Sequence, residues 1–561
     1  MLETIRKKLS SAGLEAYIIS YGNRFIGQDV LPQEHKLSAV CGFTGSAGAA
    51  VITQNKAFLL VDGRYELQAS LQVNTEQFTI VPAIPSLLSV CSLLKDENIT
   101  KIGCDFWNYS IAEINFIKKR FKDIELEDAG NWIAEAEHQD VCIFSRDIKY
   151  CGMTREDKCK LVAHFLQEQQ ADYFLFTSSD SVSWLLNIYA KDLPYSPVVR
   201  AYALVDIDGN FRLFGNKLKA EFNTESFDNL KQFFENCGSK KILYVANSTP
   251  EKIKHFINEE TKFYARDDMC QILKAEKNQT ELNGMIKAHI RDGIALVKLL
   301  NWLEKNPQQT ELSVVAKLHD LRAEQKDFFS ESFATIAGFA DNGAIVHYQP
   351  TEQTNKSLQN GNILLLDSGG QYFDGTTDIT RTISIGNPDA KIIRDFTYVL
   401  KAHIALASAR FPLNTGCTKL DAIARAPLWQ HCMDYKHGTG HGVSCFGNVH
   451  EGPISISIAG SNYPFKENMV TSIEPGIYVN KQYGIRIENL YYTSKVEDNP
   501  DYLEFRCLTV VPIDKRLIDK YLLSGGEQQW LNNYHKYVYD CLSAYVNEDE
   551  RKWLEKACSP L

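Results

Sequence analysis

The strongest constraint on the fold lies between Asp367 and Glu488, where acidic and imidazole side chains stand inside segments that otherwise have the pattern of buried strands. The apolar run 362–366 ends in Asp367 and then in turn residues, which is typical of a buried strand with a carboxylate at its end. Burying that carboxylate without a partner would be costly. Asp378 heads the alternating run 378–385, so a hairpin could bring the two aspartates together.

Further segments in this region carry acidic or imidazole groups. They are 437–442, 450–453, 472–476 and 484–488. In the last of these, the period of two in a strand puts Arg486 and Glu488 on one face. An arginine buried beside Glu488 needs an anion, so we expect Arg486 to pair with one of the carboxylates.

Two aspartates, two glutamates and one histidine in apolar surroundings need a positive partner, and two divalent metal ions fit best. In such a site, carboxylates bridge ions about 3.5–4 Å apart, and the ions activate a water and polarise a carbonyl. An oxygen-rich set with one imidazole and no thiolate favours manganese, with cobalt and zinc as alternatives. Six of the thirteen histidines fall between His347 and His450, and this clustering also indicates a site.

Several motifs match a known family. They are GAIVHYQP from Gly343, LLLDSGGQYFDGTTDITRT from Leu364, and HGTGHGV, NVHEGP, SIEPG and GIRIEN further on. Through them the chain resembles the metal-dependent pita-bread aminopeptidases and prolidases, most closely the long, three-domain cytosolic Xaa-Pro aminopeptidases (aminopeptidase P). The resemblance covers nearly the whole chain. It implies an α/β (α+β) fold with two related mixed α/β N-terminal domains before a C-terminal pita-bread catalytic domain.

The resemblance also implies the metal ligands. Asp367 would bind one ion, and His441 and Glu474 would bind the other. Asp378 and Glu488 would bridge both ions.

The same resemblance implies that a hydroxide bridging the two ions attacks the peptide carbonyl. His347 and His450 would be the catalytic imidazoles that face the substrate and stabilise the developing oxyanion. Glu474 would also carry the proton from the water to the leaving nitrogen. His437, four residues before His441, is expected to contact the substrate or support a ligand, and a structural hydrogen bond is the alternative.

The expected activity is removal of the N-terminal residue from peptides with proline at the second position. A prolidase restricted to Xaa-Pro dipeptides would share the ligand set and remains an alternative. A creatinase would lack these ligands. A non-catalytic pita-bread binding protein, an alternative of a different class, would have lost ligands that all stand here.

Three domains are expected, at 1–150, 151–273 and 274–561. The first two alternate helices and strands in a similar order, which suggests an internal duplication. The third opens with a long amphipathic helix and ends in a helical extension whose apolar stripe must be buried. The stripe consists of Trp530, Leu531, Tyr534, Val538, Cys541, Leu542 and Tyr545. It could pack on its own domain or contribute to the homodimer that the resemblance implies.

Two positions depart from the family pattern. Ser444 stands where a glycine commonly follows Gly-His-Gly-Val, and Cys445 comes next. Ser444 could narrow the channel near His441 without removing a ligand. We expect Cys445 to be packed rather than reactive, because no neighbouring group marks it as an activated nucleophile.

Bulk properties exclude other classes of protein. The net charge of -10 argues against a nucleic-acid partner, which would usually meet a basic surface. The chain has no run of about 18 apolar residues and no secretion signal, so we expect no membrane partner and a cytoplasmic location. The fourteen cysteines form no CxxC pair, which is typical of reduced thiols.

Overall fold

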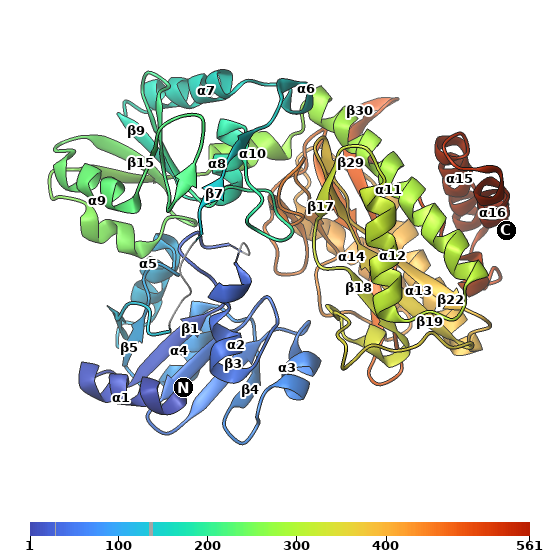
Figure 1. The fold of residues 1–561 in the computed structure, drawn as a ribbon, viewed down its shortest axis with the longest axis horizontal. Helices are drawn as coiled ribbons and strands as arrows, with labels where there is room; N and C mark the ends of the chain where they lie inside the picture. Colours follow the sequence, from blue (N-terminus) through green and yellow to red (C-terminus); the bar gives the residue numbers. More distant parts are fainter. Residues whose placement is uncertain (28–29, 134–138) are drawn as a thin grey trace. The chain divides into compact units, whose positions relative to one another are not determined.

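The computed structural model describes residues 1–27, 30–133 and 139–561, which form two compact units (Figure 1). The N-terminal unit consists of Met1–Asp147, Met153–Leu193 and Val198–Cys270, and the C-terminal unit of Ile148–Gly152, Pro194–Pro197 and Gln271–Leu561. Two short segments therefore belong to the C-terminal unit although the chain reaches them much earlier. Within the described residues, none of the helices is both long and apolar enough to cross a membrane.

The first half of the N-terminal unit is built on a six-stranded sheet. Its strands are β1 (Ala16–Ser20), β2 (Ala49–Thr53), β3 (Ala57–Val61), β4 (Thr79–Pro82), β5 (Lys101–Cys104) and β6 (Glu125–Asp128). They lie in the order β4-β3-β2-β1-β5-β6. The pairs β1–β2 and β2–β3 are antiparallel and the other three are parallel. The helices are α1 (Leu2–Ala12), α2 (Lys36–Cys41), α3 (Glu66–Gln72), α4 (Leu87–Asp96) and α5 (Ile111–Arg120).

The second half of this unit repeats that plan. Its sheet contains β9 (Tyr173–Phe176), β11 (Tyr202–Asp206), β12 (Phe211–Phe214), β14 (Thr224–Glu225), β15 (Lys241–Val245) and β16 (Lys262–Arg266). The order β14-β12-β11-β9-β15-β16 and the directions of all five pairs reproduce the first sheet. The repeated order of elements in the sequence therefore corresponds to a repeated sheet topology. The helices are α7 (Arg155–Glu168), α8 (Ser179–Leu186) and α9 (Phe227–Asn236). The next helix, α10 (Met269–Ala275), begins in this unit and belongs to the C-terminal unit from Gln271 on.

The C-terminal unit packs long helices against curved antiparallel sheets. Helices α11 (Gln279–Lys305) and α12 (Glu311–Ala323) cover a sheet of β18 (Ile336–Phe339), β19 (Asn362–Ser368) and β22 (Ile379–Ile385). A second sheet has the order β23-β30-β29-β26-β24-β25. Its strands are β23 (Arg410–Pro412), β24 (Gly440–Gly442), β25 (Glu451–Ile456), β26 (Val470–Ile473), β29 (Asn489–Val496) and β30 (Asn499–Cys507). Helices α13 (Ala390–Ala407) and α14 (Cys417–Trp429) pack beside it.

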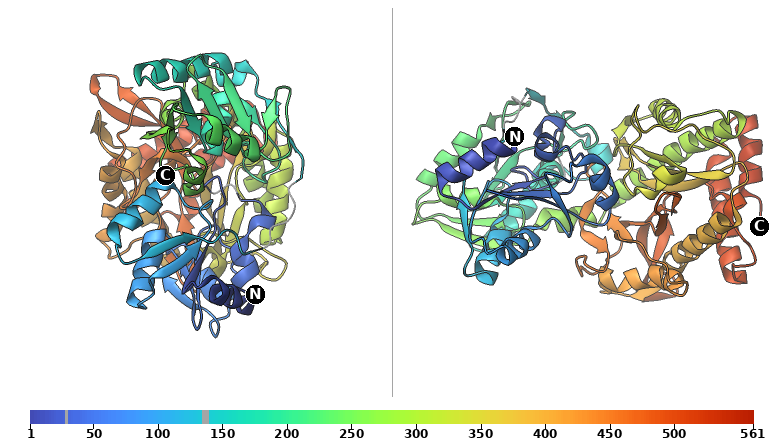
Figure 2. Two further views of the ribbon diagram at one scale, coloured as in Figure 1. Left: turned by 90° about the vertical axis from the view of Figure 1, so that its left-hand side faces the viewer. Right: turned by 90° about the horizontal axis from the view of Figure 1, so that it is seen from below.

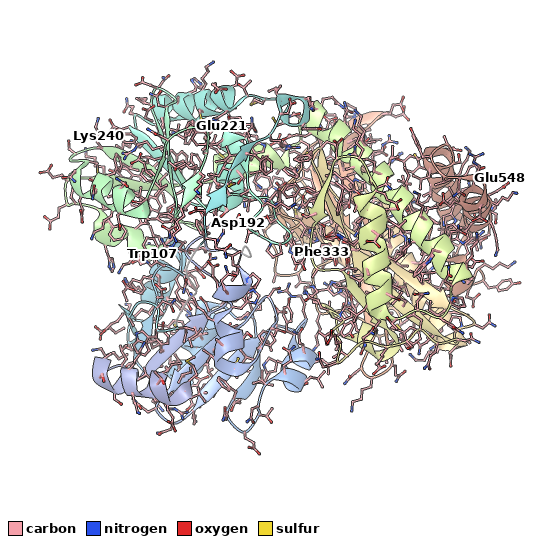
Figure 3. The ribbon with its side chains drawn as sticks, in the orientation of Figure 1. Trp107, Asp192, Glu221, Lys240, Phe333 and Glu548 are labelled. Carbon is pink, nitrogen blue, oxygen red and sulfur yellow. The ribbon has the colours of Figure 1, made fainter. Side chains whose placement is uncertain are left out.

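The chain ends in two helices, α15 (Gly525–Leu542) and α16 (Glu548–Cys558), which lie together in the right-hand view of Figure 2. Figure 3 labels Glu548 at the start of α16. Most of the predicted stripe on α15 is buried in the core of its own unit, beside Ile294 and Val297 of α11. Tyr545 is an exception, since it is 63% exposed. The prediction was wrong there because α15 ends at Leu542, so the helical spacing no longer applies.

Candidate metal centre

The antiparallel pairing of β19 with β22 brings Asp367 and Asp378 to one end of the sheet. Asp367 lies opposite Thr380, and Asp378 immediately precedes β22. The two strands are joined through the short pair β20 (Gly370–Tyr372) and β21 (Gly375–Thr376). Gly369 is required at the crossing, because a Cβ there would lie 2.0 Å from the carbonyl oxygen of Thr377. The hairpin expected from the sequence is therefore present.

The other predicted ligands converge on this end of the sheet. One ligand atom from each of Asp378, His441 and Glu488 lies within 4.8 Å of the other two. His441 Nε2 is 3.5 Å from Asp378 Oδ2 and 3.5 Å from Glu474 Oε1. Asp367 is close enough to disfavour the charged form of Asp378. All five side chains therefore meet in one place.

Like charge dominates this cluster. Burial, together with the charges of Asp367 and Glu474, raises the pKa of Asp378 well above its ordinary value. Burial and the neighbouring Asp378 and Glu474 do the same to the pKa of Glu488. Three buried carboxylates and the partly exposed Glu474 can all be ionised only beside strong positive charge, which divalent cations supply. The donor set is therefore one that fits two hard or borderline divalent cations.

Arg486 binds one of the carboxylates, as its position on the strand predicted. Its Nη2 donates to Asp367 Oδ2 over 2.5 Å, and its Nε donates to Thr380 Oγ1 over 3.0 Å. The Thr380 hydroxyl in turn donates to Glu488 Oε2 over 2.8 Å. The other oxygen of Asp367, Oδ1, is buried and has no hydrogen-bond partner among the described residues. Asp367 is therefore held through Oδ2, and its Oδ1 is available to bind a cation.

His441 is oriented as a metal-binding histidine would be. It lies on β24, and its Nδ1 donates to the carbonyl oxygen of Gly442 over 3.0 Å, which leaves the lone pair on Nε2 for the carboxylate side. Burial lowers the pKa of His441, which favours the neutral ring, the form that binds metals. Gly440 and Gly442 are needed on either side, because a Cβ would lie 2.0 Å from Ser472 O and 2.3 Å from Glu451 O, respectively.

Two of the predicted catalytic imidazoles remain accessible to solvent. His450 immediately precedes β25 and is exposed, and its ring centroid lies 4.4 Å from that of His441 at an interplanar angle of 89°. His347 is half-buried and follows the short helix η3 (Ala340–Ala344). Its neighbour Tyr348 is anchored by a hydrogen bond from its hydroxyl to Glu311 Oε2, over 2.9 Å.

Tyr478 belongs to the site and was missed by reasoning from the sequence. It lies on β27 (Gly476–Val479), which pairs with β28 (Tyr483–Arg486). Its hydroxyl accepts a hydrogen bond from Arg486 Nη1 over 2.6 Å and lies 2.9 Å from His437 Nε2. Burial raises the pKa of Tyr478 to about 12. Its place follows from the pairing of Gly476 with Arg486, after which the period of two puts Tyr478 on the face of Arg486; no local sequence pattern indicates this pairing.

His437 faces the cluster as well as this tyrosine. Its Nδ1 is 2.7 Å from Gly438 O and 3.8 Å from Glu474 Oε2. Because the carbonyl can only accept, Nδ1 carries the proton and Nε2 accepts from the Tyr478 hydroxyl. His437, Tyr478 and Arg486 therefore form one hydrogen-bonded chain beside the carboxylates.

The two departures from the family pattern have different outcomes. Ser444 is 6% exposed, and its hydroxyl donates to Glu451 Oε1 over 2.6 Å, so it turns toward that carboxylate; the expected narrowing of a channel stays a prediction. Cys445 is buried, with its sulfur 3.3 Å from Asp374 O, as expected for a packed thiol.

Several known proteins align with this chain over its whole length or nearly so. A "Probable Xaa-Pro aminopeptidase P" of Laccaria bicolor is 33% identical over 600 residues, covering 100% of this chain and 93% of the relative. The aminopeptidase P1 of Lotus japonicus is 33% identical over 658 residues, with coverages of 100% and 99%. The crystal structure of an X-prolyl aminopeptidase from Caenorhabditis elegans, described as a cytosolic enzyme with a di-nuclear active site, superposes with a TM-score of 0.92. That pair is 31% identical, over 98% of this chain and 95% of the other.

Family models match the N-terminal and the C-terminal parts of the chain separately. Residues 283–495 match metallopeptidase family M24, and 501–561 match the C-terminal region of peptidase M24. Residues 1–136 and 135–281 match two models of the creatinase/prolidase N-terminal domain. Fold and site together define an M24 metallopeptidase, with a pita-bread domain that follows two creatinase-like domains. Within that class, the chain belongs to the Xaa-Pro aminopeptidase P family.

Proposed function

We propose that this chain is a metal-dependent aminopeptidase that releases the N-terminal residue from peptides with proline at the second position. The convergence of Asp367, Asp378, His441, Glu474 and Glu488 carries this proposal. The relatives that align over the entire chain are named aminopeptidases, which favours this activity over that of a prolidase.

We propose the following ligand roles for two divalent cations, with manganese favoured by the oxygen-rich set. Asp367 would bind one cation, and His441 and Glu474 would bind the other. Asp378 and Glu488 would be shared by both cations. The solved relative from Caenorhabditis elegans, with its di-nuclear site, supports a pair of ions.

Side chains of this protein would carry out the other steps of the reaction. Two bound divalent cations would supply the Lewis acidity that polarises the scissile carbonyl and acidifies a water. Glu474 takes a proton from the attacking water and returns it to the leaving proline nitrogen. His450 and His347 donate hydrogen bonds to the oxygen on which negative charge develops. Arg486 and Tyr478 hold the carboxylates and His437 in place.

Activity on peptides of different length tests the proposal against its closest alternative. Manganese-loaded protein should release the first residue from Ala-Pro-Ala and from longer Xaa-Pro peptides, measured as free alanine. Cleavage confined to Xaa-Pro dipeptides would identify a prolidase instead. No hydrolysis of any of these peptides by the metal-loaded protein would contradict the proposed function.

We also propose three domains at 1–150, 151–273 and 274–561, a homodimer in solution, and a cytoplasmic location. The cytosolic relative and the fourteen free cysteines support that location. Light scattering at micromolar concentration should give about twice the chain mass of 63.6 kDa. A mass that stays near 63.6 kDa would contradict the dimer.

A further inference from the structure

A buried cluster of charge anchors the loop that joins His441 to His450. Glu451, the residue after His450, accepts a hydrogen bond from Lys274 Nζ on Oε1 over 2.7 Å and pairs with Lys277 through Oε2. The three charged side chains are only 1% to 3% exposed. The exposed imidazole of His450 is therefore followed in the sequence by the deeply buried carboxylate of Glu451.

Ser444 ties the beginning of the same loop to its end. It lies three residues after His441, and its hydroxyl donates to Glu451 Oε1 over 2.6 Å. Gly442 pairs with Glu451 across β24 and β25, so the backbone closes the loop at the same point. A glycine at position 444 would have no hydroxyl for this contact. We call Glu451, Lys274, Lys277 and Ser444 the Glu451 anchor.

The middle of the loop is fixed from the opposite side. The backbone N–H groups of Phe446 and Gly447 both donate to Thr376 Oγ1, over 3.1 and 3.3 Å. Gln371 Nε2 donates to the carbonyl oxygen of Gly447 over 2.6 Å. The loop is therefore held at its start, middle and end, and its last residue, His450, stays open to solvent.

Stability alone does not account for such an anchor. Buried ion clusters are often no more stabilising than apolar side chains of the same volume, because desolvation offsets the attraction. Burial would raise the pKa of Glu451, but Lys274 and Lys277 hold it below its ordinary value. What the cluster does supply is a fixed position for the backbone next to His450.

We propose that Lys274, Lys277 and Ser444 act through Glu451 as positioning residues for His450, holding its imidazole beside His441 where the scissile carbonyl must lie. This inference rests on the proposed aminopeptidase function, because it assigns His450 a contact with the substrate. The ring separation of 4.4 Å between His441 and His450 is the geometry that the anchor maintains.

Two variants of different severity test the proposal. Glu451→Gln keeps the shape of the side chain and should lower kcat/KM on Ala-Pro-Ala about ten- to a hundredfold, mostly through kcat. Ser444→Ala leaves both ion pairs intact and should lower it about threefold. Metal content should equal that of the wild type in both variants. Glu527→Gln is the matched control. It disturbs the 2.7 Å ion pair between Glu527 on α15 and Lys401 on α13, neither of which belongs to the loop, and it should leave kcat unchanged.

A double-mutant cycle with His450→Ala decides whether the anchor acts through this imidazole. If it does, adding Ser444→Ala or Glu451→Gln to His450→Ala causes no further loss of kcat. Equal losses in both backgrounds, or a loss of metal in the single variants, would overturn the inference while leaving the proposed function standing. Wild-type protein that binds metal but cleaves no Xaa-Pro peptide would overturn both.

Discussion

At the scale of single residues, the site is a set of like charges held together by the fold. Burial and the neighbouring charges of Asp367 and Glu474 raise the pKa of Asp378, and burial together with Asp378 and Glu474 raises the pKa of Glu488. Arg486 offsets part of this repulsion, but it is one cation among four carboxylates. Burying these carboxylates together therefore lowers the stability of the metal-free folded protein at neutral pH. Thermal unfolding of suitable variants can measure this effect.

Asp378→Asn should have opposite effects on activity and on the stability of the metal-free protein. Activity and metal content should be lost, because a shared ligand is removed. The thermal midpoint of the metal-free variant should rise above that of the metal-free wild type, because folding no longer has to keep Asp378 protonated at a pH where the unfolded chain releases that proton. Each unit by which the folded pKa of Asp378 was raised corresponds to about 1.4 kcal/mol.

Asp421→Asn is the control for this prediction. Asp421 is equally buried but pairs with Arg425 Nε at 2.7 Å, so its loss should lower the midpoint. A lowered midpoint for metal-free Asp378→Asn as well would show that Asp378 is not under repulsion.

The raised pKa values also predict how metal stabilisation depends on pH. In the metal-free folded state, Asp378 and Glu488 keep protons that the unfolded chain releases above about pH 4. Their contribution to stability is therefore full at acid pH and is lost as the pH rises through the folded pKa values. Bound cations replace those protons, so the gain in thermal midpoint on adding manganese should grow from about pH 5 to about pH 7. A gain that stays constant or shrinks over this range would contradict the assignment.

At the scale of elements, the sequence predicted local structure well and long-range register poorly. The hairpin of β19 and β22 was predictable because an apolar run and an alternating run flank turn residues. Tyr478 was not found, because its place beside Arg486 depends on the pairing of β27 with β28. Tyr545 was misplaced because a helical stripe does not reveal where its helix ends.

Contacts between distant parts of the chain were also beyond sequence reasoning. The segment Pro194–Pro197 belongs to the C-terminal unit. Gln371 Nε2 donates to Tyr195 O over 3.2 Å, and Ser196 Oγ donates to Asn448 Oδ1 over 2.5 Å. Partners separated by more than 170 residues leave no local pattern.

The helix α15 offers a matched pair of variants for testing its packing. Leu531 is fully buried in the core of the C-terminal unit, so Leu531→Ala should lower the free energy of unfolding by about 2–5 kcal/mol. Tyr545 lies beyond the end of the helix and is 63% exposed. Tyr545→Ala should therefore change the free energy of unfolding by less than about 0.5 kcal/mol. Urea unfolding followed by fluorescence measures both. Equal effects would mean that Tyr545 is buried in solution, as it would be inside a dimer interface.

At the scale of the whole molecule, substrate selection has to come from side chains outside the ligand set, because the ligand set itself does not distinguish one N-terminal peptide from another. A proline in the second position has no amide hydrogen and a fixed backbone angle. A secondary amide in the same place would bury a donor without a partner, which costs about 1–3 kcal/mol, and a misplaced carbonyl adds to the loss of rate.

The rates of cleavage of Ala-Pro-Ala and Ala-Ala-Ala by the manganese-loaded protein therefore test the central claim most directly. We predict that the first bond of Ala-Pro-Ala is cleaved about a hundredfold faster or more, measured as kcat/KM from the release of free alanine. Equal rates on the two peptides would contradict the claim that this site selects proline.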